Sequence, residues 1–334
     1  MEIKGLSDDN ILKISHIKEE DEWALKYRID SYHNFLKLGL PDFGPKIELD
    51  FDNIIYYKSR QESEIKNNWN DINCSVKNEL DNLGVLESEK HLDGIGVQYE
   101  SEVIYHNMLS ELEEKNVIFT SIEVAMKKYP ELVKKYFGKI VSNNENKFAA
   151  LNGAVFSGGS FIYIPPNTTL DRPLQSYFRI NSRNMGQFER TLIIVDDNSH
   201  LHYVEGCTAP TYSDSSLHAA VVEIYVGKNS SCRYSTIQNW APNVYNLVTK
   251  RALVDENGVM EWIDGNIGSR LTMKYPCCVL KGDNSKGTCI TISVASKTQE
   301  QDSGARMIHL GKNTTSNIIS KSIAQSGGNS TYRG

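Results

Sequence analysis

The chain repeats one short motif six times in its second half: Ile-Pro-Pro-Asn167, Val-Asp-Asp-Asn198, Val-Gly-Lys-Asn229, Val-Asp-Glu-Asn257, Lys-Gly-Asp-Asn284 and Leu-Gly-Lys-Asn313. Successive asparagines are 31, 31, 28, 27 and 29 residues apart. Asparagine tolerates the left-handed backbone conformation and caps its own turn, so we expect the same turn each time. A fixed period of this size predicts a solenoid, in which each coil packs only against its neighbours.

Aliphatic residues precede the turns at constant distances, which indicates a parallel β-helix. Five positions before each asparagine stand Ile162, Ile193, Ile224, Ala252, Val279 and Ile308, and we expect them to stack in one buried row. Three positions before, the row is aliphatic except at Lys281, where a one-residue bulge would bring Leu280 into place. A β-sandwich is the alternative fold, but it has no reason to reproduce one turn six times.

The first 150 residues have a different composition from the rest. They carry 28 acidic and 19 basic side chains and seven glycines, whereas residues 151–334 carry 14, 17 and sixteen. Such a change is typical of a passage from exposed helices to turn-punctuated strands. We therefore predict a mostly helical domain over residues 1–145 and a β-helix core over residues 146–334.

Helix signals support this division. Charged and apolar residues alternate with helical spacing over 20–38 and 101–116, and Pro130 begins a further helix that ends at Gly138. Thr120 and Glu123 form a capping-box pattern. Alternating apolar residues in 46–58 predict a short strand or hairpin. No chemistry is apparent in these segments.

The overall composition excludes several classes of protein. A net charge of -6 provides no positive field for a nucleic acid. No apolar run approaches the roughly 20 residues that span a bilayer, and the charged amino terminus is unlike a signal peptide. Six cysteines without regular spacing do not form a disulfide framework, so we expect a reducing cytoplasm and no membrane or nucleic-acid partner.

Counting forward from the turns locates candidate chemistry. Five positions after successive asparagines stand Tyr203, Tyr234 and Trp262, and odd offsets share the inward face of a strand. Nine positions after each asparagine the residue is polar, at Ser176, Cys207, Gln238, Asn266, Ser293 and Ser322. A polar row below an aromatic row indicates an internal passage or site, because unpaired buried polar groups are costly. The alternative is that the strand turns a corner at Gly206 and the row faces solvent.

Cys207, in Glu-Gly-Cys-Thr-Ala-Pro, is the candidate nucleophile or soft-metal ligand. Gln238 and Trp240 would lie beside it on the next strand. The other five cysteines are interpreted as structural, and His200 with His202 forms only a weak metal candidate on the opposite strand face. Walker, Rossmann, zincin and Gly-x-Ser-x-Gly motifs do not occur in the sequence.

Several longer segments resemble the SufB/SufD family of the SUF iron–sulfur cluster assembly machinery, and its SufB members in particular. These segments are Glu-Gly-Cys207-Thr-Ala-Pro, Tyr-Phe-Arg179-Ile-Asn181, Gly-Gln-Phe-Glu-Arg190-Thr-Leu-Ile-Ile, Gln238-Asn-Trp240, Val-Thr-Lys250-Arg-Ala-Leu, Met-Ile-His309-Leu-Gly-Lys-Asn and Ser-Thr-Tyr-Arg-Gly334. In the helical part, Ser-Glu-Val-Ile-Tyr-His106 and Tyr-Pro-Glu-Leu-Val-Lys-Lys-Tyr-Phe-Gly138 resemble it too. The resemblance implies a right-handed parallel β-helix between helical segments.

The resemblance also implies the site. Cys207 would accept persulfide sulfur and would be a ligand of the nascent cluster. The sulfur route through the interior would be lined by Arg179, Asn181, Gln238, Trp240 and Lys250. A thiolate of low pKa beside Lys250 or Arg179 would accept sulfur best.

The implied role is a non-enzymatic scaffold that holds sulfur and iron, forms a transient cluster of the 4Fe-4S type, and works with reduced flavin. The implied partners are the SufC ATPase, SufD or a second SufB, and the cysteine desulfurase SufS with SufE or SufU, in the cytoplasm or a plastid stroma. The family continues past the position of Gly334 with more β-helix and a carboxy-terminal helical segment that docks the ATPase, and we expect these parts to be absent here.

Two other functions remain open from the sequence. A β-helix carbohydrate-active enzyme needs two carboxylates in a groove, and Glu205 with Asp264 is the nearest pair. The chain could instead be a purely structural SUF subunit without chemistry of its own.

Overall fold

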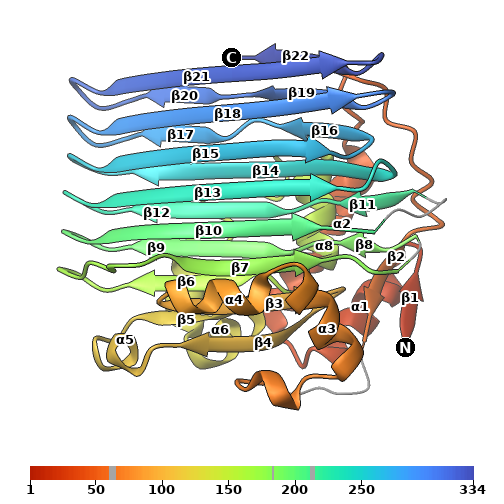
Figure 1. The fold of residues 1–334 in the computed structure, drawn as a ribbon, viewed down its shortest axis with the longest axis horizontal. Helices are drawn as coiled ribbons and strands as arrows, with labels where there is room; N and C mark the ends of the chain where they lie inside the picture. The colour runs from red at the N-terminus through yellow and green to blue at the C-terminus, as the bar shows by residue number, and fades with distance from the viewer. Residues whose placement is uncertain (60–64, 183, 211–214) are drawn as a thin grey trace.

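The computed structural model describes residues 1–59, 65–182, 184–210 and 215–334. It is mostly β, with a β-solenoid of about six turns in the C-terminal part and helices toward the N-terminus, which confirms the predicted fold class. Figure 1 shows the coils stacked one above another. None of the described helices is both long and apolar enough to cross a membrane.

Two large sheets form the walls of the solenoid. The eight-stranded sheet has the spatial order β21 (Thr315–Gln325), β18 (Lys286–Ser296), β15 (Val259–Gly268), β13 (Ser231–Trp240), β10 (His200–Thr208), β7 (Leu174–Arg179), β3 (Gly94–Tyr99) and β4 (Glu102–Met108). The twelve-stranded sheet has as its main path β22 (Asn329–Arg333), β19 (Glu300–Gly304), β16 (Leu271–Lys274), β14 (Val244–Val254), β12 (Val221–Val226), β9 (Arg190–Val195), β6 (Ser160–Ile164) and β5 (Ile118–Ser121). Off this path lie β8 (Gly186–Gln187), β11 (Ser216–His218), β17 (Cys277–Leu280) and β20 (Arg306–His309), while β1 (Glu2–Lys4) and β2 (Ile55–Lys58) form a separate pair.

The six asparagine turns have the predicted geometry. Asn167, Asn198, Asn229, Asn257, Asn284 and Asn313 all have positive φ, between 54° and 60°. Their side chains also form a ladder: the Nδ2 atoms of Asn198, Asn229 and Asn257 each donate to the Oδ1 atom of the preceding turn asparagine, at 3.1, 3.1 and 3.0 Å. The repeated turn therefore joins successive coils through both backbone conformation and side-chain hydrogen bonds.

The predicted buried row is correct in four coils and wrong in two. Ile162, Ile193, Ile224 and Ala252 pair in register and are fully buried. The next partners in this row are Cys278 and Met307, not Val279 and Ile308, which lie one residue further along and are only half-buried. The shift coincides with the predicted bulge, where the backbone N–H groups of Lys281 and Gly282 both donate to the carbonyl of Val254. Leu280 consequently pairs with Val254, as expected.

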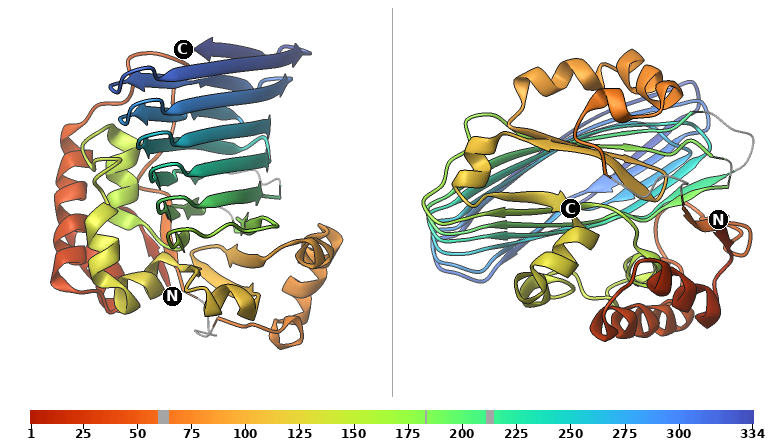
Figure 2. Two further views of the ribbon diagram at one scale, coloured as in Figure 1. Left: turned by 90° about the vertical axis from the view of Figure 1, so that its left-hand side faces the viewer. Right: turned by 90° about the horizontal axis from the view of Figure 1, so that it is seen from below.

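Helices cover one side and one end of the solenoid. The helices are α1 (Asp8–Ile17), α2 (Glu22–Lys37), α3 (Cys74–Asn82), α4 (Val85–Ser88), α5 (Ser110–Glu114), α6 (Ile122–Lys128), α7 (Pro130–Tyr136) and α8 (Lys147–Val155), with 3₁₀ turns at Trp69–Asp71 and Glu89–His91. Figure 2 shows α1, α2 and α8 along one side of the stack, and α3 and α4 beside β3 and β4 where the solenoid begins.

The local expectations for the first 145 residues have mixed outcomes. α2 and α7 lie where helices were predicted. The segment 101–116 is not one helix but β4 followed by α5, and of 46–58 only β2 is a strand. The N-cap of α6 is Ser121, whereas Glu123 instead binds Lys18 and the N–H of Gly158 from outside its helix. Tertiary contacts thus override the local pattern.

The strands before residue 145 extend the solenoid sheets. β3 pairs parallel with β7, β4 pairs antiparallel with β3, and β5 pairs antiparallel with β6. The proposed boundary at residues 145 and 146 lies just before α8. Because β3 and β4 belong to the eight-stranded sheet and β5 to the twelve-stranded sheet, the two proposed parts share both sheets.

A buried ion pair attaches the helical layer to the outer face of the twelve-stranded sheet. Arg190 on β9 and Glu223 on β12 lie 2.6 Å apart, and both side chains are fully buried. The Glu223 carboxylate also accepts hydrogen bonds from the N–H groups of Gly138, Ile140 and Val141, which follow α7, at 2.9 to 3.0 Å. One carboxylate therefore joins the sheet to the chain that precedes α8.

Replacing Asn229 by alanine should lower the free energy of unfolding by about 1–2 kcal/mol, because alanine lacks the side-chain hydrogen bonds with which asparagine offsets the cost of positive φ. Asn229→Gly should cost less, because glycine adopts this φ readily. Chemical denaturation of both variants checks this. Equal losses would mean that the side-chain ladder, not the backbone conformation, determines the stability of the turn.

Glu223→Ala should lower the free energy of unfolding by about 3–5 kcal/mol, because it leaves Arg190 buried without its partner. The matched control is Glu261→Ala, which removes the partner of Arg233 on the surface, 2.8 Å away, and should cost about 0–1 kcal/mol. Similar losses in the two variants would contradict the anchoring role of Glu223.

Candidate functional site

Cys207 lies inside the solenoid. Side chains along β10 alternate between buried and more exposed, and Cys207 falls on the buried face with an exposed fraction of 0%. The alternation continues past Gly206, so the strand does not turn a corner there and the predicted face is correct. In register beside Cys207 are Gln238 on β13 and Phe178 on β7.

The rows predicted around Cys207 also face inward except at Ser322, and the predicted register is wrong at Ser176. Tyr203, Tyr234 and Trp262 are fully buried, and neighbouring rings are tilted against each other with centroids 5.0 and 5.2 Å apart. In the polar row, Ser176 pairs with Glu205 instead of Cys207, and Ser322 is exposed. The remaining members of the polar row are at most 1% exposed.

Two lysines and two carboxylates share this interior. Lys250 Nζ donates to Thr236 Oγ1 at 2.8 Å and lies 3.6 Å from Asp264 Oδ1 and 3.9 Å from Glu205 Oε1. Lys274 Nζ lies 3.1 Å from Asp264 Oδ1, and all four charged side chains are at most 2% exposed. Buried charges persist only when they are paired, which these contacts achieve.

Sequence reasoning placed Lys250 correctly in the interior but missed Lys274. Lys274 lies on the strand Leu271–Lys274 of the opposite wall, and the rows counted forward from the turn asparagines do not include this strand. Burial lowers the pKa of Lys274, although Asp264 opposes the shift.

The Cys207 thiol does not have the expected low pKa. Burial, followed by the nearby carboxylates of Glu205 and Glu189, raises its pKa well above the ordinary value, against the opposing effect of Lys250 and Lys274. The Sγ atom donates to Glu205 Oε1 at 3.6 Å. Burial and the two carboxylates therefore oppose deprotonation of the Cys207 thiol, which is hydrogen-bonded to a carboxylate that can accept its proton.

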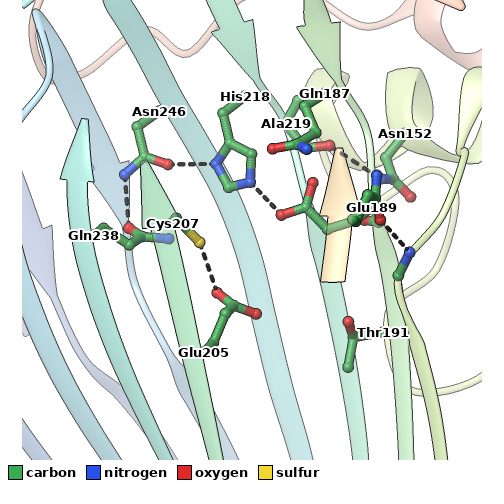
Figure 3. Close-up of polar contacts among 12 residues, drawn as sticks. Asn152, Gln187, Glu189, Thr191, Glu205, Cys207, His218, Ala219, Gln238 and Asn246 are labelled. Atoms are coloured by element: carbon green, nitrogen blue, oxygen red, sulfur yellow. Dashed lines mark hydrogen bonds and ion pairs between the residues drawn. The ribbon is translucent and has the colours of Figure 1, made fainter. Parts of the chain in front are cut away.

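A second set of polar side chains, Glu189, His218 and Asn246, lies on the opposite wall near Cys207 (Figure 3). Glu189 hydrogen-bonds to His218 Nε2, and His218 Nδ1 lies 2.7 Å from Asn246 Oδ1. Asn246 Nδ2 donates to Gln238 Oε1 at 2.8 Å. Glu189 and Asn246 were missed because neither has a fixed offset from a turn asparagine, and His218 was not considered.

Trp240 is 2% exposed and packs in a cluster with Cys207 and Phe178, its ring centroid 4.7 Å from that of His218. Cys207, Gln238 and Trp240 are thus brought together as expected.

Arg179 and Asn181 lie elsewhere than predicted. Phe178 is the inward residue beside Cys207, so Arg179 points outward from β7, where it pairs with Glu79 of α3 and donates to Thr208 Oγ1 at 2.8 Å. Asn181 follows the strand and donates to the hydroxyl of Tyr99. Neither lines the interior, because alternation along β7 sends Arg179 to the outer face and Asn181 is bonded to Tyr99 beyond the end of the strand.

The remaining cysteines and histidines show no gathered metal site. Cys232, Cys278 and Cys289 are buried in the apolar core, Cys277 is buried on β17, and Cys74 is exposed. His200 and His202 instead bond to serine hydroxyls at 2.8 and 3.0 Å. In the part of the chain that the structure describes, no three His, Cys, Asp or Glu side chains are grouped so that they could hold a metal ion.

Trp240→Ala should lower the free energy of unfolding by about 3–5 kcal/mol, as expected for a buried indole. Gln238→Ala should cost about 1–3 kcal/mol, because Asn246 and Lys274 lose an acceptor. Ile237→Ala, at an exposed neighbouring position, is the control and should cost little. If denaturation finds equal losses for Gln238 and Trp240, Gln238 is chiefly a structural residue.

Comparison with known proteins assigns the family. Residues 178–334 match the family model described as "SUF system FeS cluster assembly, SufBD core domain", and residues 97–176 match "SufBD protein N-terminal region". An iron–sulfur cluster assembly SufBD family protein of Staphylococcus saprophyticus is 56% identical over 333 residues, covering 99% of this chain and 71% of the relative. Proteins with the same description in Staphylococcus aureus strains USA300 and MRSA252 are 56% and 55% identical, with the same coverage. The chain therefore belongs to the SufBD family, whose members take part in iron–sulfur cluster assembly.

Proposed function

We propose that this chain is a SufB-type scaffold subunit that accepts persulfide sulfur on Cys207 and holds a nascent cluster for transfer. The observation that carries the proposal is a thiol with 0% exposure inside a solenoid, beside buried amide, indole and ammonium groups. An apolar interior would suffice for stability. Polar and charged groups around one thiol instead suit a site that handles a polar sulfur species.

The transfer step needs no external oxidant. The Cys207 sulfur attacks the terminal sulfur of a donor persulfide R–S–SH, so that a new S–S bond forms at Cys207 and the donor S–S bond breaks. The products are Cys207–S–SH and R–SH. Glu205, which accepts a hydrogen bond from the thiol, takes its proton, and the proton passes to the departing thiolate.

The cargo would be iron and sulfur, assembled as a cluster of the 4Fe-4S type. Cys207 would supply one thiolate ligand to it, and the other ligands would come from a second subunit, because no three His, Cys, Asp or Glu side chains are grouped for a metal ion in the described part of this chain.

The partners follow from a role in the SUF system. We propose a SufC-type ATPase, a second SufBD subunit, and a cysteine desulfurase of the SufS type with SufE or SufU as sulfur carrier. Free cysteines without disulfides among the described residues suit a reducing cytoplasm or plastid stroma.

Arg179 and Asn181, which lie outside the interior near α3, no longer belong to the proposed interior route.

The carbohydrate-active alternative loses its support. Glu205 and Asp264 are each 2% exposed and face the interior, with Lys250 between them, so no groove presents the two carboxylates to a sugar. The purely structural subunit is the outcome that the following experiment separates from the proposal.

The purified chain, mixed anaerobically with iron, a cysteine desulfurase and its sulfur carrier, should acquire sulfane sulfur on Cys207 in preference to Cys232 and Cys278. Mass-spectrometric mapping of persulfides measures this. Cys207→Ser should abolish most of the uptake and Cys232→Ser should not. Sulfur spread evenly over all six cysteines, or absent from Cys207, would remove the proposed role and favour a structural subunit.

A further inference from the structure

Four buried side chains form an unbroken hydrogen-bonded chain that ends beside Cys207. The chain runs from Glu189 through His218 and Asn246 to Gln238, and each of the four is at most 1% exposed. Three members belong to one wall, with Glu189 just before β9, His218 on β11 and Asn246 on β14, whereas Gln238 comes from β13 of the other wall. A connection of this kind fixes the orientation of every group in it.

The hydrogen bonds between Glu189, His218, Asn246 and Gln238 all have a defined donor and acceptor. A carboxylate can only accept, so His218 Nε2 donates to Glu189. The Asn246 atom that faces His218 Nδ1 is the amide oxygen, which also only accepts, so Nδ1 donates to it. Asn246 then has its nitrogen free to donate to Gln238 Oε1, which also accepts from Lys274 Nζ at 3.1 Å. Burial opposes a charge on His218, but the Glu189 carboxylate outweighs it and raises the pKa of the imidazole, as two donating ring nitrogens require.

The direction of these hydrogen bonds decides which end of the Gln238 amide faces Cys207. With Oε1 held by two donors, Nε2 is left over, and it has no hydrogen-bond partner among the described residues. Figure 3 shows this nitrogen on the side of the amide that faces the Cys207 sulfur. Trp240 Nε1 is a second buried donor for which the described residues provide no acceptor. An unpaired buried donor costs about 1–3 kcal/mol, so the Gln238 nitrogen that faces the thiol indicates a place for an acceptor that arrives from outside.

We propose that Glu189, His218 and Asn246 are positioning residues that hold the Gln238 amide with its N–H donors toward Cys207, where these donors bind the terminal sulfur of the Cys207 persulfide. This inference rests on the proposed sulfur acceptance at Cys207. It assigns to the three residues a role that acts through Gln238, without contact to the sulfur.

Two substitutions test the donor and its orientation. Gln238→Glu keeps the acceptor for Asn246 and removes the donor to sulfur, whereas Asn246→Asp removes the donor to Gln238 Oε1 and lets the amide reverse. Each should slow persulfide formation on Cys207 at least tenfold when a small inorganic polysulfide is the donor. Asn239→Asp, the same chemical change on the exposed face of β13, should leave the rate unchanged.

Two substitutions of Glu189 distinguish a positioning role from a purely structural role. Glu189→Gln can donate to a neutral His218 Nε2, so Nδ1 still donates to Asn246, and loading should stay within about threefold of the unsubstituted chain. Glu189→Leu, of similar volume, removes the partner of Nε2 and should slow loading as strongly as Asn246→Asp. Circular dichroism and denaturation establish that each variant is folded, and if Asn246→Asp does not fold, the two Glu189 variants still decide.

The outcomes separate this inference from the proposed function. If the unsubstituted chain does not load Cys207, the proposed function fails. If it loads and Gln238→Glu loads equally fast, the amide does not bind sulfur. If Gln238→Glu is impaired while Asn246→Asp and Glu189→Leu load normally, Gln238 needs no positioning chain. Either of the last two results overturns the inference and leaves sulfur acceptance intact.

Discussion

The left-handed asparagine turn is the constraint on which the rest of the structure depends. Each turn ends one strand at the same place in the coil, and the ladder of asparagine amides holds successive turns together. Because a shift of one residue sends every side chain to the other face of a strand, this repeated endpoint keeps Cys207 and Gln238 in register inside the solenoid.

The same constraint produces an interior that is unusual for its charge. Apolar residues fill the part of each coil near the turns, whereas polar and ionisable groups gather where Cys207 lies. Lys250, Lys274, Asp264 and Glu205 offset one another, yet the Gln238 and Trp240 donors find no acceptor among the described residues. A core selected only for stability would bury aliphatic side chains here, so the polar interior supports the proposal that this site handles a sulfur cargo.

The helical layer and the solenoid are not independent. The Arg190–Glu223 pair connects the outer face of one sheet to the segment before α8, and β3 to β5 add strands to both sheets. On the opposite side, Glu79 of α3 forms an ion pair with Arg179. Arg179, which was expected in the sulfur route, therefore makes a contact outside the interior. The first 145 residues thus determine what covers the solenoid near Cys207.

The sequence alone determined the coil period, the turn, the inward face of β10 and the neighbours Gln238 and Trp240, because these follow from local conformation and strand alternation. It could not place Val279 and Ile308, since a bulge at Lys281 shifts the register of the last coils. It could not show the raised pKa of Cys207, which arises from burial and from carboxylates on two walls. The meeting of Glu189, His218 and Asn246 with Gln238 was decided only by the tertiary structure, because opposite walls of a solenoid come together through chain closure and leave no periodic trace in the sequence.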